Sequence, residues 1–278
     1  MPRPLYSFGI SPCPNDTYIF DALIHGRSPA SFDTRLFMAD VEELNVLARG
    51  SRLAVTKVSM AAAAHILDRY LLLNVGAALG RGCGPLVVSR EELSVAECRN
   101  ASIAIPGKMT TANLLLALTG CFAGPREEMI FDQVMSAVEQ GRVALGVIIH
   151  EGRFTYADRG LKLVLDLGQW WETTTRLPLP LGVIAARRDL GLEAIRRVEE
   201  AIRQSLLHAR ANPDDSLAFS RAHAQEMDET VMASHIATFV NEYSLDLGEE
   251  GRRAMESLLQ AAADDAGISL PQLPFFVD

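Results

Sequence analysis

Short apolar runs alternate with helix-like stretches through the first third of the 278-residue chain. Brief runs rich in β-branched and aromatic residues are typical of strands, and apolar residues spaced three or four apart are typical of helices. The pattern predicts strands at Leu5–Ser11, Thr34–Met38, Leu53–Val58, Tyr70–Val75 and Pro85–Ser89, and helices at Tyr18–His25, Val41–Ala48 and Met60–Leu67. A glycine-rich connection, Gly76–Gly84, separates the last two strands.

The alternation then repeats before the chain becomes wholly helical. Strands are expected at 101–105, 129–131, 143–149, 161–167 and 181–186, helices at 110–118 and 133–140, and a loop at 170–180. Beyond Leu190 the apolar spacing predicts helices at 190–211, 214–226, 229–241 and 248–266. Strands that alternate with helices imply right-handed crossovers and mainly parallel sheets, so the fold class is α/β.

Two strand-like crossings, near residues 85–100 and 176–187, separate the two alternating units. The chain is therefore expected to enter a second lobe once and to return once. This organisation gives a first lobe of residues 1–97 plus 180–278 and a second lobe of residues 98–179. Ligands of open α/β sheets bind at the carboxyl ends of strands, so a cleft between the lobes is the expected binding site.

Composition and charge exclude several classes of protein. A chain that is 49% hydrophobic and 22% charged is neither disordered nor fibrous. Its net charge of −9 argues against non-specific nucleic-acid binding, which needs clustered cations. Residues 1–97 carry 9 basic and 10 acidic side chains, residues 98–179 carry 8 of each, and residues 180–278 carry 9 and 17. The acidic surplus therefore belongs to the C-terminal helices and says little about the cleft.

The cysteines and the N-terminal segment indicate a cytoplasmic protein. The four cysteines form no CxxC pair and no regular framework, which fits a reducing compartment. The start of the chain lacks the apolar stretch and cleavage site of a signal peptide. No apolar run approaches the roughly 18 residues needed to span a bilayer. We therefore expect no membrane association.

The most unusual segment is Ser11–Thr17, with the sequence SPCPNDT, between a predicted strand and a predicted helix. Its prolines stiffen the turn, and Asn15, Asp16 or Thr17 can cap the helix. The free amides of the first helical turn favour an anion, although a rigid capped turn explains the segment equally well. Cys13 is a weaker candidate for a nucleophile, because no neighbour in sequence would activate it.

Two further polar segments follow predicted strands. In Thr56–Ser59, Lys57 offers a charge and Ser59 a hydroxyl to a carboxylate, or they are an exposed lysine and a helix cap. The segment Pro106–Ala112 resembles a phosphate-binding loop superficially, but Met109 stands where that loop needs Ser or Thr. We therefore reject a nucleotide site there and expect its amides and hydroxyls to bind a carboxylate or hydroxyl group. Two of the three lysines, Lys57 and Lys108, lie in these segments.

His150 opens the fourth polar segment, directly after a strongly apolar predicted strand. A zinc protease motif would need a second histidine four residues later, where Phe154 stands, so metal binding by this motif is rejected. Histidine has a pKa near neutral pH and is a suitable general base, although a histidine bonded into a turn is an equal alternative. The other five histidines all fall within or at the end of predicted helices.

All four polar segments fall at the carboxyl ends of predicted strands. Unrelated structural turns have no reason to share that edge of both sheets. A single cleft lined by all four explains the coincidence. We therefore predict a site for a small, anionic, hydroxylated molecule, with His150 as the best base.

The segments GISPCPNDTYIFDALIHG, VTKVS, PGKMTTANLLL and GVIIHEGRFTY resemble the 1,4-dihydroxy-6-naphthoate synthases of the futalosine route to menaquinone. They span both predicted lobes in the family's order and approximate spacing, and SPCPNDT distinguishes this family from the related chorismate dehydratases. The resemblance implies a periplasmic-binding-protein-like fold of type II, with two α/β lobes around a cleft and a helical C-terminal region.

The resemblance also implies a cofactor-independent carbon–carbon lyase without a metal. It would convert cyclic dehypoxanthinyl futalosine to 1,4-dihydroxy-6-naphthoate and release a three-carbon fragment, dihydroxyacetone. Carried over by motif, His150 is the expected proton acceptor, and Asn15 and Asp16 are expected near the reacting sugar. The residues implied to hold the carboxylate and hydroxyls are Lys57, Val58, Ser59, Thr110, Thr111 and Ala112.

Two other functions share the expected fold. A non-catalytic solute-binding protein is one, although such receptors act outside the cytoplasm, and a chorismate dehydratase is the other. The protein is expected to be a monomer or a homodimer. Trp170 and Trp171 fit either a wall or hinge of the site or ordinary core packing.

Overall fold

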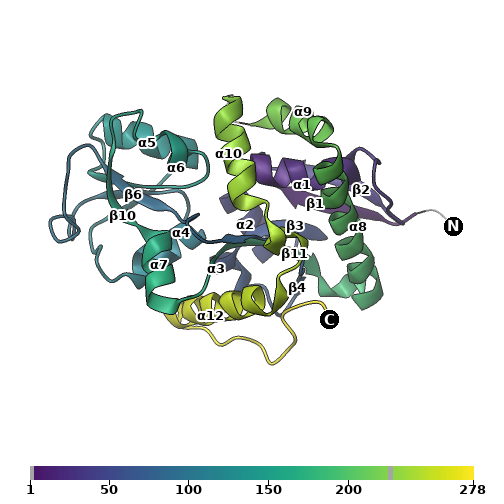
Figure 1. Cartoon of the computed structure of the whole chain (residues 1–278). Helices are drawn as coiled ribbons and strands as arrows, with labels where there is room; N and C mark the ends of the chain where they lie inside the picture. The colour runs from purple at the N-terminus through teal and green to yellow at the C-terminus, as the bar shows by residue number, and fades with distance from the viewer. Residues whose placement is uncertain (1–2, 225–227) are drawn as a thin grey trace.

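The computed structural model describes residues 3–224 and 228–278, which form two α/β parts side by side (Figure 1). The first sheet has the strand order β2-β1-β3-β11-β4, with β5 paired to β11. Its strands are β1 (Leu5–Ile10), β2 (Asp33–Met38), β3 (Val55–Ser59), β4 (Tyr70–Leu72), β5 (Ala78–Gly80) and β11 (Leu179–Arg187). Since β11 comes late in the chain, segments far apart in sequence build this sheet together.

The second sheet has the strand order β10-β6-β9-β7-β8. Its strands are β6 (Leu86–Ser89), β7 (Ile103–Ile105), β8 (Arg126–Glu128), β9 (Leu145–Ile148) and β10 (Lys162–Asp166). The chain enters this sheet after β5 and leaves it after β10. Each crossing therefore joins the two sheets by a single connection.

Helices cover both sheets, and the C-terminal region is helical as expected. The helices that follow strands of the first sheet are α1 (Pro14–Ile24), α2 (Val41–Arg49) and α3 (Met60–Ala63). Those inserted among or after the strands of the second sheet are α4 (Thr111–Leu118), α5 (Phe131–Glu139), α6 (Gly152–Thr155) and α7 (Leu167–Thr175). After β11 come the short 3-10 turn η1 (Arg188–Leu190), α8 (Leu192–Ala211), α9 (Pro213–His223), α10 (Glu229–Phe239), α11 (Glu242–Leu245) and α12 (Gly248–Ala266). The end of the helix predicted at 214–226 lies outside the described residues.

The expectation of mainly parallel sheets is wrong in one respect. The strands β1, β2 and β3 are parallel, as are β7, β8 and β9. However, β11 runs antiparallel to β3, β4 and β5, and β6 runs antiparallel to β9 and β10. The antiparallel members lie next to the crossings, where the chain changes sheets. An apolar run in the sequence indicates that a strand is buried, but it does not indicate whether the neighbouring strand is parallel or antiparallel.

Several predicted elements also differ. The segment expected as a loop at 170–180 is largely the helix α7, which Asp166 caps by accepting a hydrogen bond from the amide of Gln169. Trp171 is 3% exposed and donates to the carbonyl of Pro178, so it packs in the core. The strand expected at 129–131 is β8, three residues earlier, and β6 joins the second sheet rather than completing the first. A small strand, β5, lies within the expected glycine-rich connection.

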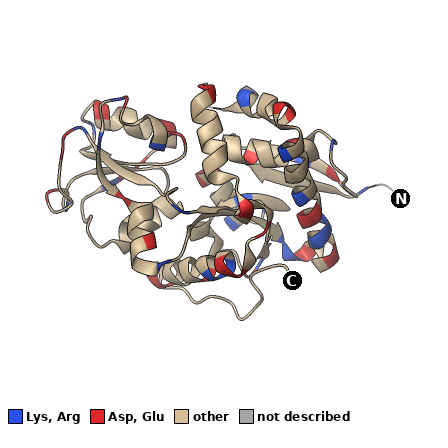
Figure 2. Cartoon of the chain, viewed as in Figure 1, with Lys and Arg blue, Asp and Glu red and all other residues tan. Residues whose placement is uncertain are grey.

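Helix α1 is almost wholly buried, because α8, α9 and α10 pack over it. The later helices carry their acidic residues on the outer surface: Figure 2 shows red segments along α8, α9 and α12. Exposed examples are Glu193, Asp214 and Asp264. Among the described residues, no helix is long and apolar enough to cross a membrane.

Candidate functional site

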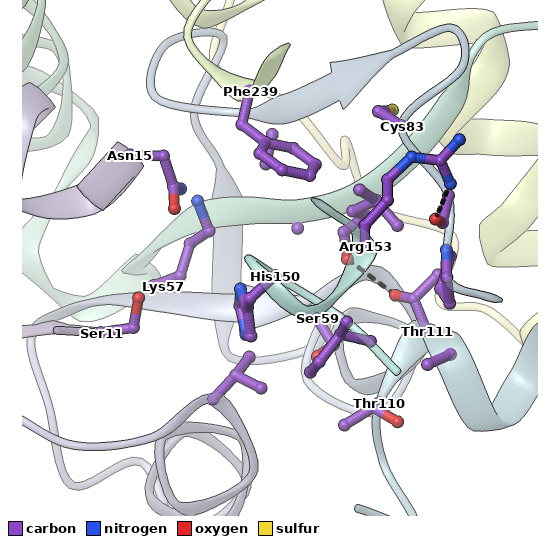
Figure 3. Close-up of a pocket in the computed structure, with 18 of the residues that line it drawn as sticks. Ser11, Asn15, Lys57, Ser59, Cys83, Thr110, Thr111, His150, Arg153 and Phe239 are labelled. Atoms are coloured by element: carbon purple, nitrogen blue, oxygen red, sulfur yellow. Dashed lines mark hydrogen bonds between the residues drawn. The ribbon is translucent and has the colours of Figure 1, made fainter. Parts of the chain in front are cut away.

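One cavity, with about 690 Å³ of empty space including its mouth, lies between elements of the two sheets (Figure 3). Residues from all four polar segments line it, namely Ser11, Asn15, Lys57, Ser59, Thr110, Thr111, Ala112, His150 and Arg153. The direction of the strands explains why these segments meet. The strands β1 and β3 are parallel in one sheet, and β7 and β9 are parallel in the other, so their carboxyl ends face one cleft.

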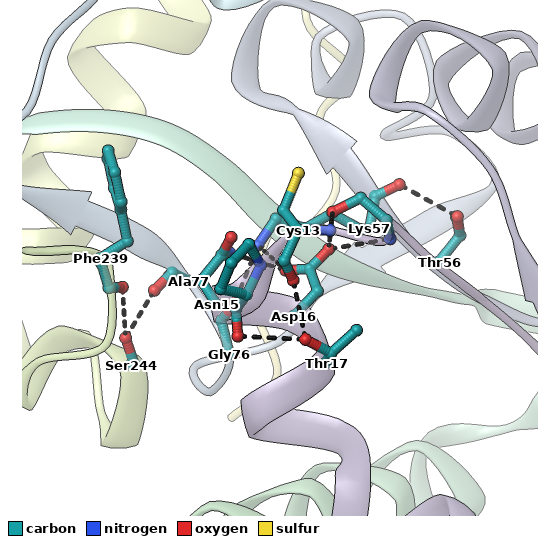
Figure 4. A network of polar contacts seen from close by, with 12 residues as sticks. Cys13, Asn15, Asp16, Thr17, Thr56, Lys57, Gly76, Ala77, Phe239 and Ser244 are labelled. Atoms are coloured by element: carbon teal, nitrogen blue, oxygen red, sulfur yellow. Dashed lines mark hydrogen bonds and ion pairs between the residues drawn. The ribbon is translucent and has the colours of Figure 1, made fainter. Parts of the chain in front are cut away.

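A buried ion pair holds the floor of the cavity (Figure 4). The Nζ of Lys57 lies 2.8 Å from Oδ1 of Asp16, and these side chains are 6% and 0% exposed. Asp16 also accepts hydrogen bonds from the amide and hydroxyl of Ser11 and from the Nδ2 of Asn15. The Lys57 ammonium further donates to the carbonyl of Gly76 at 3.4 Å. Asp16 therefore neutralises and positions Lys57, instead of facing a ligand.

The turn before α1 is built differently from the capping first expected. Helix α1 begins at Pro14, and Cys13 occupies the N-cap position, but its side chain does not accept a capping hydrogen bond from the helix. Asp16 points back to Ser11, and the hydroxyl of Thr17 donates to the carbonyl of Cys13. The prolines fix the backbone, which leaves these polar side chains free for the network around Lys57.

Three other residues of the predicted motifs lie apart from the cavity surface. Val58 is fully buried in the core, because neighbouring residues of a strand point to opposite faces and Lys57 and Ser59 take the cavity side. Asp16 lies behind Lys57, as described above. Lys108 does not belong to the site: its side chain is 75% exposed and pairs with Glu128.

Ser59 and the start of α4 offer donors to a ligand. The Oγ of Ser59 accepts from Nδ2 of Asn45, so its own proton can be donated into the cavity. The Thr110 hydroxyl donates to the carbonyl of Gly107, and the Thr111 hydroxyl donates to that of Leu181. These hydroxyls mainly fix the turn, whereas the amides of Thr111 and Ala112, in the first turn of α4, have no carbonyl within the helix to bind. An anionic group is favoured there.

His150 lies in the turn after β9 with a left-handed backbone, φ 55°. Such a conformation is uncommon for a residue with a side chain, and it often occurs at functional sites. Its ring packs edge-on to Phe131, with centroids 4.9 Å apart, and its Nδ1 lies 3.4 Å from Sγ of Cys13. The imidazole is thus held at the boundary between the two lobes.

Burial sets the protonation of these two groups. Desolvation lowers the pKa of His150, although the charges of Glu151 and Asp16 oppose that shift. The neutral imidazole, which can accept a proton on one ring nitrogen, is therefore favoured. Burial, reinforced by Glu151, raises the pKa of the Cys13 thiol well above its usual value. The thiol stays protonated at neutral pH, so a nucleophilic role for Cys13 is disfavoured.

Three further residues line the cavity: Arg153 belongs to the fourth polar segment, whereas the sequence did not single out His235 and Phe239. Arg153 donates to the carbonyl of Gly84 and to Asp166, from α6, which begins two residues after His150. His235 and Phe239 reach the cavity from α10 in the C-terminal region. The sequence placed both residues only within the helix predicted at 229–241. Only the approach of α10 to the second lobe, visible in Figure 1, brings them to the site.

The chain is similar to known proteins over almost its whole length. A family model described as menaquinone biosynthesis matches residues 6–264. The 1,4-dihydroxy-6-naphtoate synthase of Thermus thermophilus is 49% identical over 270 residues, which cover 97% of this chain and 98% of the relative. The enzyme of the same name from Streptomyces coelicolor is 45% identical, with 91% of each chain covered.

Solved structures agree with the fold and identify its architecture. The protein AF1704 from Archaeoglobus fulgidus superposes with a TM-score of 0.88 at 36% identity, covering 95% of this chain and 98% of that one. The periplasmic aliphatic sulphonate-binding protein SsuA from Escherichia coli gives 0.63 at 12% identity, covering 97% and 93%. The fold is thus periplasmic-binding-protein-like, as expected. By its sequence, the chain belongs to the menaquinone biosynthesis family of 1,4-dihydroxy-6-naphthoate synthases.

Proposed function

We propose that this protein converts cyclic dehypoxanthinyl futalosine to 1,4-dihydroxy-6-naphthoate and dihydroxyacetone, with His150 as the general base. The observation that carries this assignment is the placement of a neutral imidazole in the same cavity as the donors of β3 and α4. A base and an anion-binding turn that line one cavity suit a substrate with a carboxylate and hydroxyl groups.

The substrate carboxylate lies, in this proposal, against the amides of Thr111 and Ala112 with the Ser59 hydroxyl beside them. The sugar hydroxyls then face Asn15 and Lys57. Because Asp16 already neutralises Lys57, the ammonium is a local hydrogen-bond donor more than a strong net charge. This arrangement suits a hydroxylated sugar better than a second carboxylate.

His150 takes the proton of a sugar hydroxyl, and that oxygen forms a carbonyl as the adjacent carbon–carbon bond breaks. The electron pair of the broken bond passes to the ring side as an enolate, which nearby hydrogen-bond donors stabilise. Aromatisation of the ring then provides the driving force. The atoms of the substrate divide between the two products without an external oxidant or reductant, so we propose that the reaction needs no cofactor.

The test is the substitution His150→Asn in the purified protein, assayed with the cyclic substrate. Loss of a general base typically costs about 10²–10⁴-fold in rate, so kcat should fall by that factor while the melting temperature is retained. His223→Asn, a histidine outside the cavity, is the matched control and should keep full turnover. Turnover close to that of the unsubstituted protein in His150→Asn would exclude His150 as the base.

The same assay separates the alternative functions. A solute-binding protein would bind the cyclic compound tightly without product, and a chorismate dehydratase would consume chorismate. We propose that neither occurs, and that the enzyme acts in the cytoplasm as a monomer or homodimer. The free thiols of Cys13, Cys83, Cys98 and Cys121 support a reducing compartment.

A further inference from the structure

Buried polar atoms beside His150 have no role in the proposed reaction. His235 is 1% exposed, and neither of its ring nitrogens has a hydrogen-bond partner among the described residues. The Oε2 of Glu151 is also buried and is unpaired within residues 3–224 and 228–278. Buried polar groups are nearly always bonded, because leaving them unpaired is costly. These atoms therefore favour a ligand that bonds to them.

The unpaired atoms converge on His150. The Nε2 of His235 lies 4.0 Å from Oε2 of Glu151, and one donor atom from each of His150, Glu151 and His235 lies within 4.8 Å of the others. His150 and Glu151 are consecutive residues after β9, whereas His235 comes from α10. Both histidines line the cavity, so a small ligand can reach them from it.

Two imidazoles and one carboxylate form a donor set that suits a transition metal. Zinc takes nitrogen and oxygen ligands at about 2.0–2.1 Å, which places tetrahedral ligands about 3.4 Å apart. Side-chain rotations that move each donor atom by about 1 Å bring the three donors to that spacing. Desolvation lowers the pKa of His150 and, more strongly, of His235, which favours the neutral form that an imidazole needs to coordinate an ion.

We propose that His150, Glu151 and His235 form a binding site for a divalent transition-metal ion, with Zn²⁺ as the best fit. The sequence motif HExxH does not mark this site, because its second histidine, His235, comes from a helix far away in the sequence. Mg²⁺ and Ca²⁺ prefer all-oxygen sites and are excluded by the two imidazoles.

Binding of the ion also has a consequence for activity, which rests on the proposed function. A metal bound to His150 occupies the lone pair that would accept the substrate proton. The ion is therefore an inhibitor and not a cofactor, and substrate and metal compete for the cavity.

The binding test is calorimetric titration of the metal-free full-length protein with Zn²⁺, and with Mg²⁺ as a selectivity control. We expect one zinc ion per chain. His235→Gln and the nearly isosteric Glu151→Gln should each weaken binding at least about tenfold, because loss of even an outer-shell partner has such an effect. His65→Gln, a half-buried histidine outside the cluster, should bind zinc unchanged. Thermal melts verify that each variant is folded.

Failure of the protein to bind zinc, or equal affinity in the folded Glu151→Gln and His65→Gln variants, would overturn the proposed site. A separate assay with the cyclic substrate then measures inhibition. Zinc that binds through the cluster without lowering turnover would uphold the metal site and contradict the role of His150 as base. The two proposals can therefore fail independently.

Discussion

Asp16 shows how one residue can serve the site without facing it. Its two carboxylate oxygens accept hydrogen bonds from Ser11, Asn15 and Lys57. A buried charge pair is stable only when its other hydrogen bonds are also made, and this one meets that condition. The residue-by-residue transfer from the family placed Asp16 beside the substrate. Its contacts assign it instead to the orientation of Lys57 and Asn15, which do line the cavity.

Removal of either partner of this pair should destabilise the fold. Asp16→Asn and Lys57→Met each leave an uncompensated or underpaired buried group and should lower the free energy of unfolding by about 3–5 kcal/mol. The double variant removes both charges and should cost clearly less than the sum of the two. Urea denaturation of the four proteins measures the coupling. Strictly additive losses would show that the pair does not act as a unit.

The lowered pKa of His150 predicts the pH dependence of the reaction. An ordinary histidine titrates near 6.5, and burial keeps His150 neutral to a lower pH. The value of kcat/KM should therefore be at its full level at neutral pH and decline only as the pH falls through a value below about 6.5. A profile of kcat/KM against pH with the cyclic substrate locates the midpoint of this decline. A midpoint above pH 6.5, or the same acidic decline of kcat/KM in His150→Asn, would contradict the assignment of His150 as the base.

At the scale of elements, α2 of the first lobe fixes the turn before α4 of the second. Glu42 accepts a hydrogen bond from the amide of Met109 at 2.9 Å, and Asn45 joins Glu42 to Ser59. Burial raises the pKa of the Glu42 carboxyl, and the Met109 amide opposes that shift. Helix α2 thereby fixes the position of the turn before α4 relative to Ser59 at the end of β3.

Gly107 lies against the Glu42 side chain, where there is no room for a Cβ atom. Its φ is 148°, and a Cβ there would lie 2.6 Å from the Glu42 carboxylate. We expect Gly107→Ala to shift the start of α4 and to lower kcat/KM by roughly 10- to 100-fold, since small displacements of binding groups are costly. Gly120→Ala is the matched control, because Gly120 has positive φ but open space around it. Equal effects of the two substitutions would attribute the loss to backbone strain alone.

At the scale of the molecule, the C-terminal tail completes the first sheet. The amide of Leu72 in β4 donates to the carbonyl of Phe275, and Val277 donates back to Leu72. Phe276 is 6% exposed and lies under the guanidinium of Arg252. The first lobe is therefore closed by the segment that is most distant in sequence from its first strand.

Phe276→Ala should consequently destabilise the whole protein. Loss of a buried phenylalanine costs about 3–5 kcal/mol, which chemical denaturation measures as a lower free energy of unfolding. Leu273→Ala is the control: Leu273 is 46% exposed, and its loss should change stability by less than about 0.5 kcal/mol. A similar, small effect of both substitutions would show that the tail is not part of the folded core.

The limits of sequence reasoning are clearest at α7 and α10. The polar run that follows Trp171 suggested a loop, yet one face of that segment is buried and the other carries the threonines. His235 gave no signal, because a histidine in a helix normally reflects packing. In both cases the deciding contacts join segments far apart in the chain.

The sequence alone determined the α/β class, the helical C-terminal region and the segments from which the cavity is built, since periodicity, capping and turn residues act locally. It also placed His150 and the start of α4 at strand ends. Only the tertiary structure decided that β11 and β6 are antiparallel, that Asp16 supports Lys57, and that His235 meets His150 and Glu151. Those outcomes depend on which distant segments pack together, and the free energy of that packing is shared among residues that no local pattern connects.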